Sequence, residues 1–202
     1  MTMRKALIAY NNDSSVVLHD FFESCADEAK QICLDGKVDF TSVCPPNMNE
    51  KNVCEAMLDH QICVIAGHGD SDGIYNELGN SVVSCGTTNY NFNGKGFYSV
   101  ACSCAQNLYP HLKSLGLLFF VGYNDTFRVK GDSEPFVNSA MAGLKSFLSG
   151  DDAKTAKEKM LDEYDTQIAA LDEDSWEAKF LVHNKESLVF DSDNNLVFTD
   201  LK

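Results

Sequence analysis

A cysteine and a histidine each follow a short apolar run that ends in small residues. Cys102 follows residues 96–101 (Gly-Phe-Tyr-Ser-Val-Ala), and His68 follows residues 62–67 (Ile-Cys-Val-Ile-Ala-Gly). Apolar runs of this length, bounded by turn residues, are typical of strands buried in a parallel sheet. The carboxyl ends of parallel strands meet at one edge of the sheet, where ligands of open α/β folds bind. The sequence therefore predicts that Cys102 and His68 lie together at that edge.

A thiol and an imidazole placed in this way can form a nucleophilic dyad. The thiolate of Cys102 would attack a carbonyl carbon, and His68 would act as the base and then protonate the leaving amine. We expect the backbone N–H groups of Gly69 and Cys102 to form the oxyanion hole. The simpler interpretation makes Cys102 a small buried hydrophobic residue and His68 a turn residue. The matching positions of the two residues at strand ends favour the dyad.

Cys104 lies two residues after Cys102 and leaves several alternatives open. It can be the nucleophile itself, a packing residue, or the partner of Cys102 in a thiol redox protein. The Cys-Ser-Cys spacing together with His68 also permits a metal site, but zinc sites in proteins usually have more ligands than this pattern supplies. We expect neither a metal at this site nor an organic cofactor. The acidic surface leaves a regulatory calcium ion as an open alternative, although the sequence has no binding loop of the EF-hand type.

Composition restricts the partners and the compartment. The formal net charge is −14 over 202 residues, which argues against nucleic acid or an anionic membrane surface as a partner and favours cationic substrates. No apolar run reaches the ~20 residues of a transmembrane helix, and the first run is too short for a signal peptide. Eight cysteines without a secretion signal indicate reduced thiols and a cytoplasmic protein.

The elements around the two motifs follow the order of a parallel α/β sheet. Strands are predicted at Lys5–Tyr10, at 38–43 and before His68, and they alternate with helices that cover about 16–34 and 49–59. The polar residues at 12–15 are expected to cap the first helix. This order predicts parallel strands joined by right-handed crossovers.

The second half of the chain continues the pattern. Glycines punctuate residues 70–96, which predicts a hairpin insertion between two strands of the sheet. We then expect a helix over 105–115, a strand over 117–122, helices over 136–148 and 153–171, and final strands at 177–182 and 188–198. A single domain over residues 1–202 accounts for this order.

The two motifs resemble those of the clan CD cysteine peptidases, the caspase-like group that includes caspases, metacaspases, clostripain, gingipains, separase and the CHAT domains. Residues 64–69 (Val-Ile-Ala-Gly-His-Gly) match that group's histidine motif, and residues 97–102 (Phe-Tyr-Ser-Val-Ala-Cys) match its cysteine motif. The order of the later elements is most similar to that of CHAT and separase-type domains. The resemblance implies an α/β, caspase-like three-layer sandwich with a mostly parallel central sheet flanked by helices, and it selects Cys102 over Cys104 as the nucleophile.

The same resemblance implies a substrate. In separase-like members, an aspartate just past the strand after the cysteine receives an arginine of the substrate, and Asp125 stands at a similar position. Asp125 is therefore expected to bind a Lys or Arg side chain, although an aspartate there is also typical of an ordinary turn. Asp70 and Asp72 are acidic alternatives in the loop after His68.

The resemblance as a whole implies a cysteine endopeptidase that acts on protein or peptide substrates. It also implies a role in bacterial defence or regulated cell death, and a regulatory or activating protein partner. The chain departs from caspases, because Cys104 stands where their Gln-Ala-Cys-x-Gly motif has its glycine. A caspase-like module that has lost proteolysis and serves as a binding or scaffold domain is the alternative, although such a module needs neither His68 nor Cys102.

Overall fold

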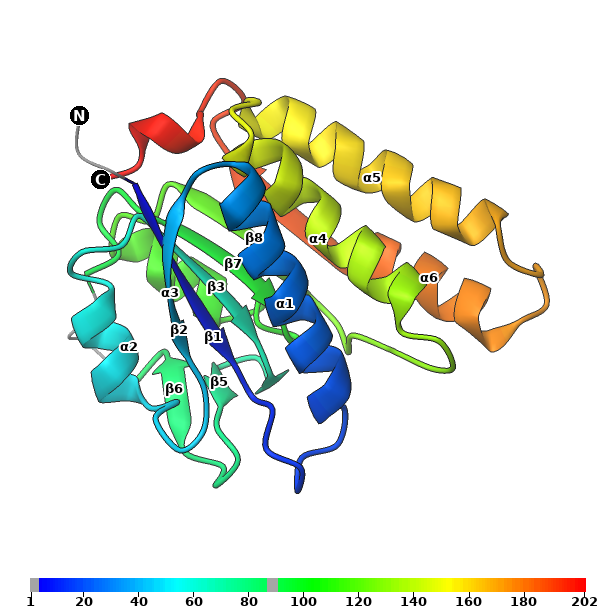
Figure 1. Cartoon of the computed structure of the whole chain (residues 1–202), viewed down its shortest axis with the longest axis horizontal. Coiled ribbons are helices and arrows are strands. Elements are labelled where there is room, and N and C mark those ends of the chain that lie inside the picture. The colour runs from blue at the N-terminus through cyan, green and yellow to red at the C-terminus, as the bar shows by residue number, and fades with distance from the viewer. Residues whose placement is uncertain (1–3, 87–90) are drawn as a thin grey trace.

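The protein has three layers, seen in a computed structural model that describes residues 4–86 and 91–202 (Figure 1). A six-stranded sheet forms the middle layer, in the order β2-β1-β3-β7-β8-β9. All neighbouring strands are parallel except β8 and β9. This confirms the predicted three-layer α/β fold with a mostly parallel sheet. The strands are β1 (Lys5–Tyr10), β2 (Asp39–Val43), β3 (Ile62–Ala66), β7 (Gly96–Val100), β8 (Phe119–Tyr123) and β9 (Leu188–Ser192).

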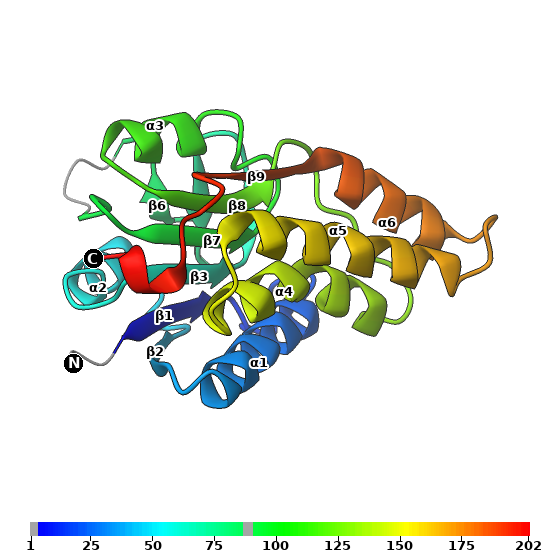
Figure 2. The ribbon, with the colours of Figure 1, turned by 90° about the horizontal axis from the view of Figure 1, so that it is seen from above.

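Helices cover both faces of the sheet (Figure 2). One core receives side chains from α1 (His19–Asp35), α4 (Glu134–Leu148), α5 (Ala153–Ala169) and α6 (Trp176–Ser187). The other core receives them from α2 (Glu50–Ala56) and α3 (Leu108–Ser114). A short 3-10 helix, η1 (Phe198–Asp200), follows β9. Over the described ranges, no helix is long and apolar enough to cross a membrane.

Alternate side chains of each buried strand face opposite cores, because successive residues of a strand point to opposite faces. In β1, Ile8 and Tyr10 pack in the core between the sheet and the helices α1 and α4. Leu7 and Ala9 pack in the core on the side of α2 and α3. A strand covered on both faces reads as a continuous apolar run, which is why the bounds of β1 follow from the sequence.

A small antiparallel sheet occupies the excursion between β3 and β7. It consists of β4 (His68–Gly69), β5 (Gly73–Tyr75) and β6 (Ser81–Ser84) in that order. Ile74 and Val83 pair across it and are fully buried in the core beside α2. The hairpin is therefore anchored to the main body directly after His68. Residues 87–90 of the predicted insertion lie outside the described residues.

The prediction of a strand over 177–182 is wrong, because this segment lies within α6. Ser175 caps the helix, its side chain accepting a hydrogen bond of 3.1 Å from the N–H of Ala178. Ala178, Leu181 and Asn184 recur at helical spacing and are buried. The cap and the buried stripe outweigh the strand preference of the aromatic and β-branched residues between them.

The first helix also begins later than its expected cap residues predict. Asp13 does not cap α1; its carboxylate accepts hydrogen bonds from the N–H and the hydroxyl of Ser15, at 2.9 and 2.6 Å, and closes a local turn. The chain enters α1 through Leu18, which has a left-handed backbone with φ of 69°. Residues 11–18 therefore form a loop beside the carboxyl ends of the strands.

Candidate active site

The carboxyl ends of β3 and β7 bring His68 and Cys102 to the same edge of the sheet. Ala66 pairs with Val100 in the parallel register, so His68 and Cys102 each stand two residues beyond a matched position. The N–H of Gly67 continues the pairing with a hydrogen bond of 3.3 Å to the carbonyl of Val100. The two strands thus deliver a histidine and a cysteine at the same level of the fold.

Gly69 lets the histidine segment lie directly against the cysteine segment. A Cβ atom at this position would stand 3.0 Å from the carbonyl oxygen of Cys102 and 3.1 Å from the Cβ of Ala101. A real side chain would force these two backbones apart, because its neighbours are main chain and a short rigid side chain. The glycine after the histidine is thus required by close approach.

The imidazole of His68 is held from the side of α1. Its Nε2 atom lies 2.9 Å from the carbonyl oxygen of Val17. The ring meets the ring of Phe22 edge-on, with centroids 5.2 Å apart and an interplanar angle of 90°. A carbonyl oxygen only accepts hydrogen bonds, so Nε2 carries a proton, and Nδ1 is the nitrogen left to act as a base.

Cys102 is a half-buried thiol. Its Sγ atom lies 3.9 Å from the carbonyl oxygen of Phe127. Burial raises the pKa of the thiol, and the nearby carboxylate of Asp125 raises that pKa further. No hydrogen bond within the described residues joins the thiol to the His68 ring. The geometry is that of a neutral thiol that needs a base when it reacts.

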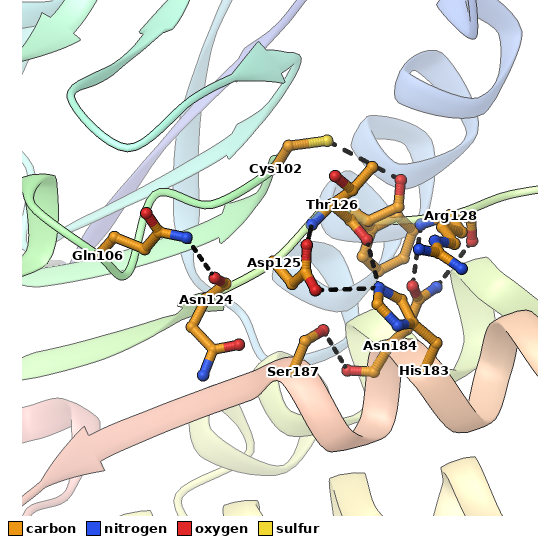
Figure 3. Close-up of polar contacts among 10 residues, drawn as sticks. Cys102, Gln106, Asn124, Asp125, Thr126, Arg128, His183, Asn184 and Ser187 are labelled. Atoms are coloured by element: carbon orange, nitrogen blue, oxygen red, sulfur yellow. Dashed lines mark hydrogen bonds and ion pairs between the residues drawn. The ribbon is translucent and has the colours of Figure 1, made fainter.

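The turn after Cys102 is fastened to the loop that follows β8. Ser103 has a left-handed backbone with φ of 54°, and its N–H donates to the carbonyl of Asp125 at 3.0 Å. The side-chain amide of Gln106 donates to the carbonyl of Asn124 at 2.7 Å. These contacts fix the loop 124–128 against the cysteine (Figure 3).

Cys104 has the environment of a packing residue. It is fully buried in the core beside α2 and α3, whereas Cys102 packs against the core on the opposite face of the sheet. Its Sγ atom lies 3.0 Å from the hydroxyl of Ser99, and burial raises the pKa of its thiol. This disfavours both a second nucleophile and a disulfide with Cys102. The described part of the chain also has no group of three or more His, Cys, Asp or Glu side chains that could hold a metal ion.

Asp125 is an exposed carboxylate beside the thiol. Its side chain is 59% exposed. One oxygen accepts a hydrogen bond of 2.7 Å from the N–H of Thr126, and the other lies 4.0 Å from Nε2 of His183. The side chain thus makes the local turn contact expected of an ordinary aspartate and still offers a negative charge to solvent near Cys102.

The acidic alternatives in the loop after His68 are engaged in holding that loop. The carboxylate of Asp70 accepts hydrogen bonds from the N–H groups of Asp72 and Gly73, at 2.8 and 3.0 Å, and from the hydroxyl of Tyr75 at 2.9 Å. Asp72 accepts a hydrogen bond of 2.8 Å from the amide of Asn107. Asp125 is therefore the better candidate to receive a cation.

Three residues at the candidate site were not predicted from the sequence: Val17, His183 and Asn184. Val17 contributes only a backbone carbonyl, which no side-chain pattern can indicate. His183 and Asn184 contact the loop after β8 from α6 (Figure 3). The strand predicted over 177–182 ends directly before them and gave no reason to place them there. The N-cap at Ser175 was the one signal that could have revealed the helix.

Comparison with solved structures finds this fold in a known cysteine peptidase. Gingipain R (RgpB), described as an Arg-specific cysteine proteinase, matches with a TM-score of 0.71 and 12% identity, over 98% of this chain and 48% of that one. The complex of the pro- and mature domains of RgpB from Porphyromonas gingivalis matches with a TM-score of 0.65 and 10% identity, over 98% and 49%. The chain thus spans about half the length of these structures. No protein-family model and no curated protein matches the sequence. The likeness in structure confirms that the chain has the caspase-like fold of the clan CD cysteine peptidases, which the motifs around His68 and Cys102 predict.

Proposed function

We propose that the protein is a cysteine endopeptidase that hydrolyses peptide bonds of protein substrates through a dyad of Cys102 and His68. The observation that carries the proposal is the contact between two strand ends. The matched register of Ala66 and Val100 places the two residues at one level, and Gly69 packs against Cys102. A hydrolase of this class needs a base next to its thiol.

In the first half of the reaction, the thiol proton moves to Nδ1 of His68, and Sγ of Cys102 forms a bond with the carbonyl carbon. The contact of Nε2 with the Val17 carbonyl supports this role for Nδ1 and stabilises the imidazolium that forms. The carbonyl oxygen gains negative charge, and the N–H groups of Gly69 and Cys102 are the proposed donors to it.

In the second half, the C–N bond breaks and His68 gives its proton to the leaving amine. A thioester with Cys102 remains. Water then attacks the thioester, His68 takes the proton from that water, and the C–S bond breaks to release a carboxylic acid and the free thiol. Each proton taken by the imidazole is returned, so the dyad ends the cycle as it began.

Asp125 is the proposed determinant of a preference for Lys or Arg before the cleaved bond. Its exposed carboxylate lies close enough to Cys102 to raise the pKa of the thiol. A cation bound to Asp125 would cancel that effect, so a basic substrate would favour the reactive thiolate. The Arg specificity in the description of gingipain R belongs to that protein and supports the same preference here. The net charge of −14 would also attract cationic segments.

The reactivity of the Cys102 thiol is a property that another protein could control. The thiol has a raised pKa and is not hydrogen-bonded to His68 within the described residues. We therefore include a regulatory or activating protein partner in the proposal. The RgpB structure that combines pro- and mature domains supports such regulation in that protein. A role in defence or regulated cell death rests on the family resemblance alone.

The two alternatives receive less support. A binding or scaffold module needs neither the thiol nor the imidazole, and it gives no reason for a glycine that lets their backbones touch. A redox protein needs Cys104 to reach Cys102, and Cys104 is fully buried on the other face of the sheet.

Hydrolysis of fluorogenic peptides tests the proposal. The full chain is incubated with peptides that carry Arg, Lys, Asp or Leu before the reporter, and initial rates are compared with those of Cys102→Ala and Cys104→Ala. We expect hydrolysis of the Arg and Lys peptides by the wild type and by Cys104→Ala, and none by Cys102→Ala. A rate in Cys102→Ala equal to that of the wild type would exclude this thiol as the nucleophile.

A further inference from the structure

A buried side chain of α6 holds the loop 124–128, which follows β8. The side-chain oxygen of Asn184 accepts a hydrogen bond of 2.9 Å from the N–H of Arg128. The side-chain nitrogen of Asn184 donates a bond of 2.8 Å to the carbonyl of the same residue. Asn184 is fully buried, so its amide holds one residue's main chain through two bonds that water cannot replace.

Two more groups of α6 hold the same loop, and one of them is the His183 ring drawn in Figure 3. His183 lies with Nε2 2.9 Å from the carbonyl of Thr126, which makes this nitrogen the donor. The carbonyl at the end of the helix, that of Ser187, accepts a bond of 2.9 Å from the N–H of Asn124. The helix therefore holds the loop 124–128 at three successive points.

The opposite side of this loop forms part of the candidate site. The carbonyl of Asp125 accepts from the N–H of Ser103, the residue after the nucleophile. The carbonyl of Phe127 faces the thiol of Cys102 at 3.9 Å. A shift of the loop would therefore move the Asp125 carboxylate and the Phe127 carbonyl relative to the thiol.

We propose that His183 and Asn184 are positioning residues that set substrate preference by holding the loop 124–128 against Cys102. The part of this inference that concerns preference rests on the proposed role of Asp125 in binding a basic side chain. The part that concerns the thiol stands on geometry alone. If the loop were held at only one end, the Asp125 carboxylate would be mobile. A basic side chain of the substrate would then have to order this carboxylate on binding.

The test uses four variants of the full chain. Asn184→Ala removes both bonds to Arg128. His183→Leu removes the donor to Thr126, whereas His183→Gln keeps an N–H donor on a side chain without a ring. Ser175→Ala removes the cap at the far end of the same helix and touches no residue of the loop, so it controls for loss of helix stability.

Two readouts are measured on each variant after its fold is checked by circular dichroism. The first is the ratio of kcat/KM for an Arg peptide to that for the matching Leu peptide. The second is the rate at which iodoacetamide alkylates Cys102, measured by peptide mass spectrometry. Cys44 and Cys85, both partly exposed, serve as reference thiols in the same sample, and this readout requires no peptidase activity.

We expect Asn184→Ala and His183→Leu to lower the Arg-to-Leu ratio about tenfold, the effect of losing one or two well-placed hydrogen bonds. The same variants should alkylate several-fold faster at Cys102, because the loop no longer holds the Asp125 carboxylate close to the thiol. His183→Gln and Ser175→Ala should stay close to the wild type in both readouts. If Asn184→Ala does not fold, the two His183 variants decide the question.

The outcomes separate this inference from the proposed function. Equal effects of Ser175→Ala and Asn184→Ala would overturn the inference, because general destabilisation would explain both. A preference for Arg that Asp125→Ala abolishes but that the α6 variants leave intact would also overturn it, while the proposed function would stand. No hydrolysis by the wild type, together with faster alkylation in the α6 variants, would contradict the proposed function and support the positioning of the loop.

Discussion

The carbonyl oxygen of Val17 lies 2.9 Å from Nε2 of His68. This contact joins the loop before α1 to β4, which directly follows β3, across 51 residues of sequence. Because a carbonyl only accepts, it sets the tautomer of a neutral His68 and turns Nδ1 into the basic nitrogen. In the proposed dyad, this main-chain group would take the place of the side chain that orients the imidazole in enzymes with three catalytic side chains.

Gly69→Ala should lower activity far more than Gly67→Ala. The added methyl at position 69 would stand 3.0 Å from the Cys102 carbonyl, whereas at position 67 its nearest neighbours are side-chain atoms at 3.7 Å. We expect a loss of about 1–3 kcal/mol in unfolding free energy from overpacking at position 69, and a fall in kcat/KM of about tenfold or more, because the two strand ends move apart. Thermal melts and initial rates measure both. Equal activity in the two variants would show that the close approach of the strand ends does not matter to the reaction.

Asp125→Asn should shift the alkylation profile of Cys102 to lower pH. The thiolate is the reactive form, and its fraction rises as pH passes through the pKa of the thiol. Burial, and after it the Asp125 carboxylate, raises this pKa. Removing the charge therefore lowers the pKa and leaves the effect of burial in place. Alkylation rates are measured against pH, with Asp162→Asn on the exposed face of α5 as the control. A profile that stays in place would mean that the carboxylate does not act on the thiol.

Asp125→Ala should reduce the preference for basic peptides. Because the carboxylate is more than half exposed, solvent screens it, and we expect kcat/KM for the Arg peptide to fall only about tenfold. The rate on the Leu peptide should change little or rise. Asp72→Ala serves as the comparison, because that carboxylate is bonded to Asn107. If Asp72→Ala abolishes the preference and Asp125→Ala keeps it, the basic side chain is received on the other side of the site.

Cys104→Ala should keep the activity and lose stability. The thiol is fully buried, and its removal leaves a small cavity next to Ser99, which retains its bond to the carbonyl of Val121. We expect a cost of about 1–2 kcal/mol in unfolding free energy, read from a denaturant titration. Mild oxidation of the wild type should form no disulfide between Cys102 and Cys104. A mass loss of two hydrogens that reductant reverses and that Cys104→Ala abolishes would instead support the redox alternative.

Strand ends were the most predictable part of the molecule. A strand buried on both faces is a continuous apolar run, so β1, β3 and β7 stand out in the sequence, and the parallel arrangement follows from the helices between them. His68 and Cys102 stand directly after such runs, and their convergence at one edge follows from the topology of the sheet.

Two kinds of contact could not be predicted from the sequence. The first are contacts of the main chain, and the second are contacts from α6, part of which was predicted to be a strand. The Val17 carbonyl depends on a left-handed turn at Leu18, a residue type that rarely adopts that conformation. Asn184 reaches Arg128 from α6, whereas residues 177–182, directly before it, were predicted to form a strand. The first feature arises from tertiary packing, which a single sequence does not encode in a local pattern. The second had a local signal in the N-cap at Ser175.

The proposed function depends on activation of the Cys102 thiol by His68. Intact mass after exposure to a peptidyl-arginine acyloxymethyl ketone tests it most directly, on the wild type, His68→Ala, Cys102→Ala and Cys104→Ala. We predict one adduct on the wild type and on Cys104→Ala, none on Cys102→Ala, and slower labelling of His68→Ala. An adduct that persists in Cys102→Ala, or labelling that is as fast without the imidazole as with it, would contradict the dyad.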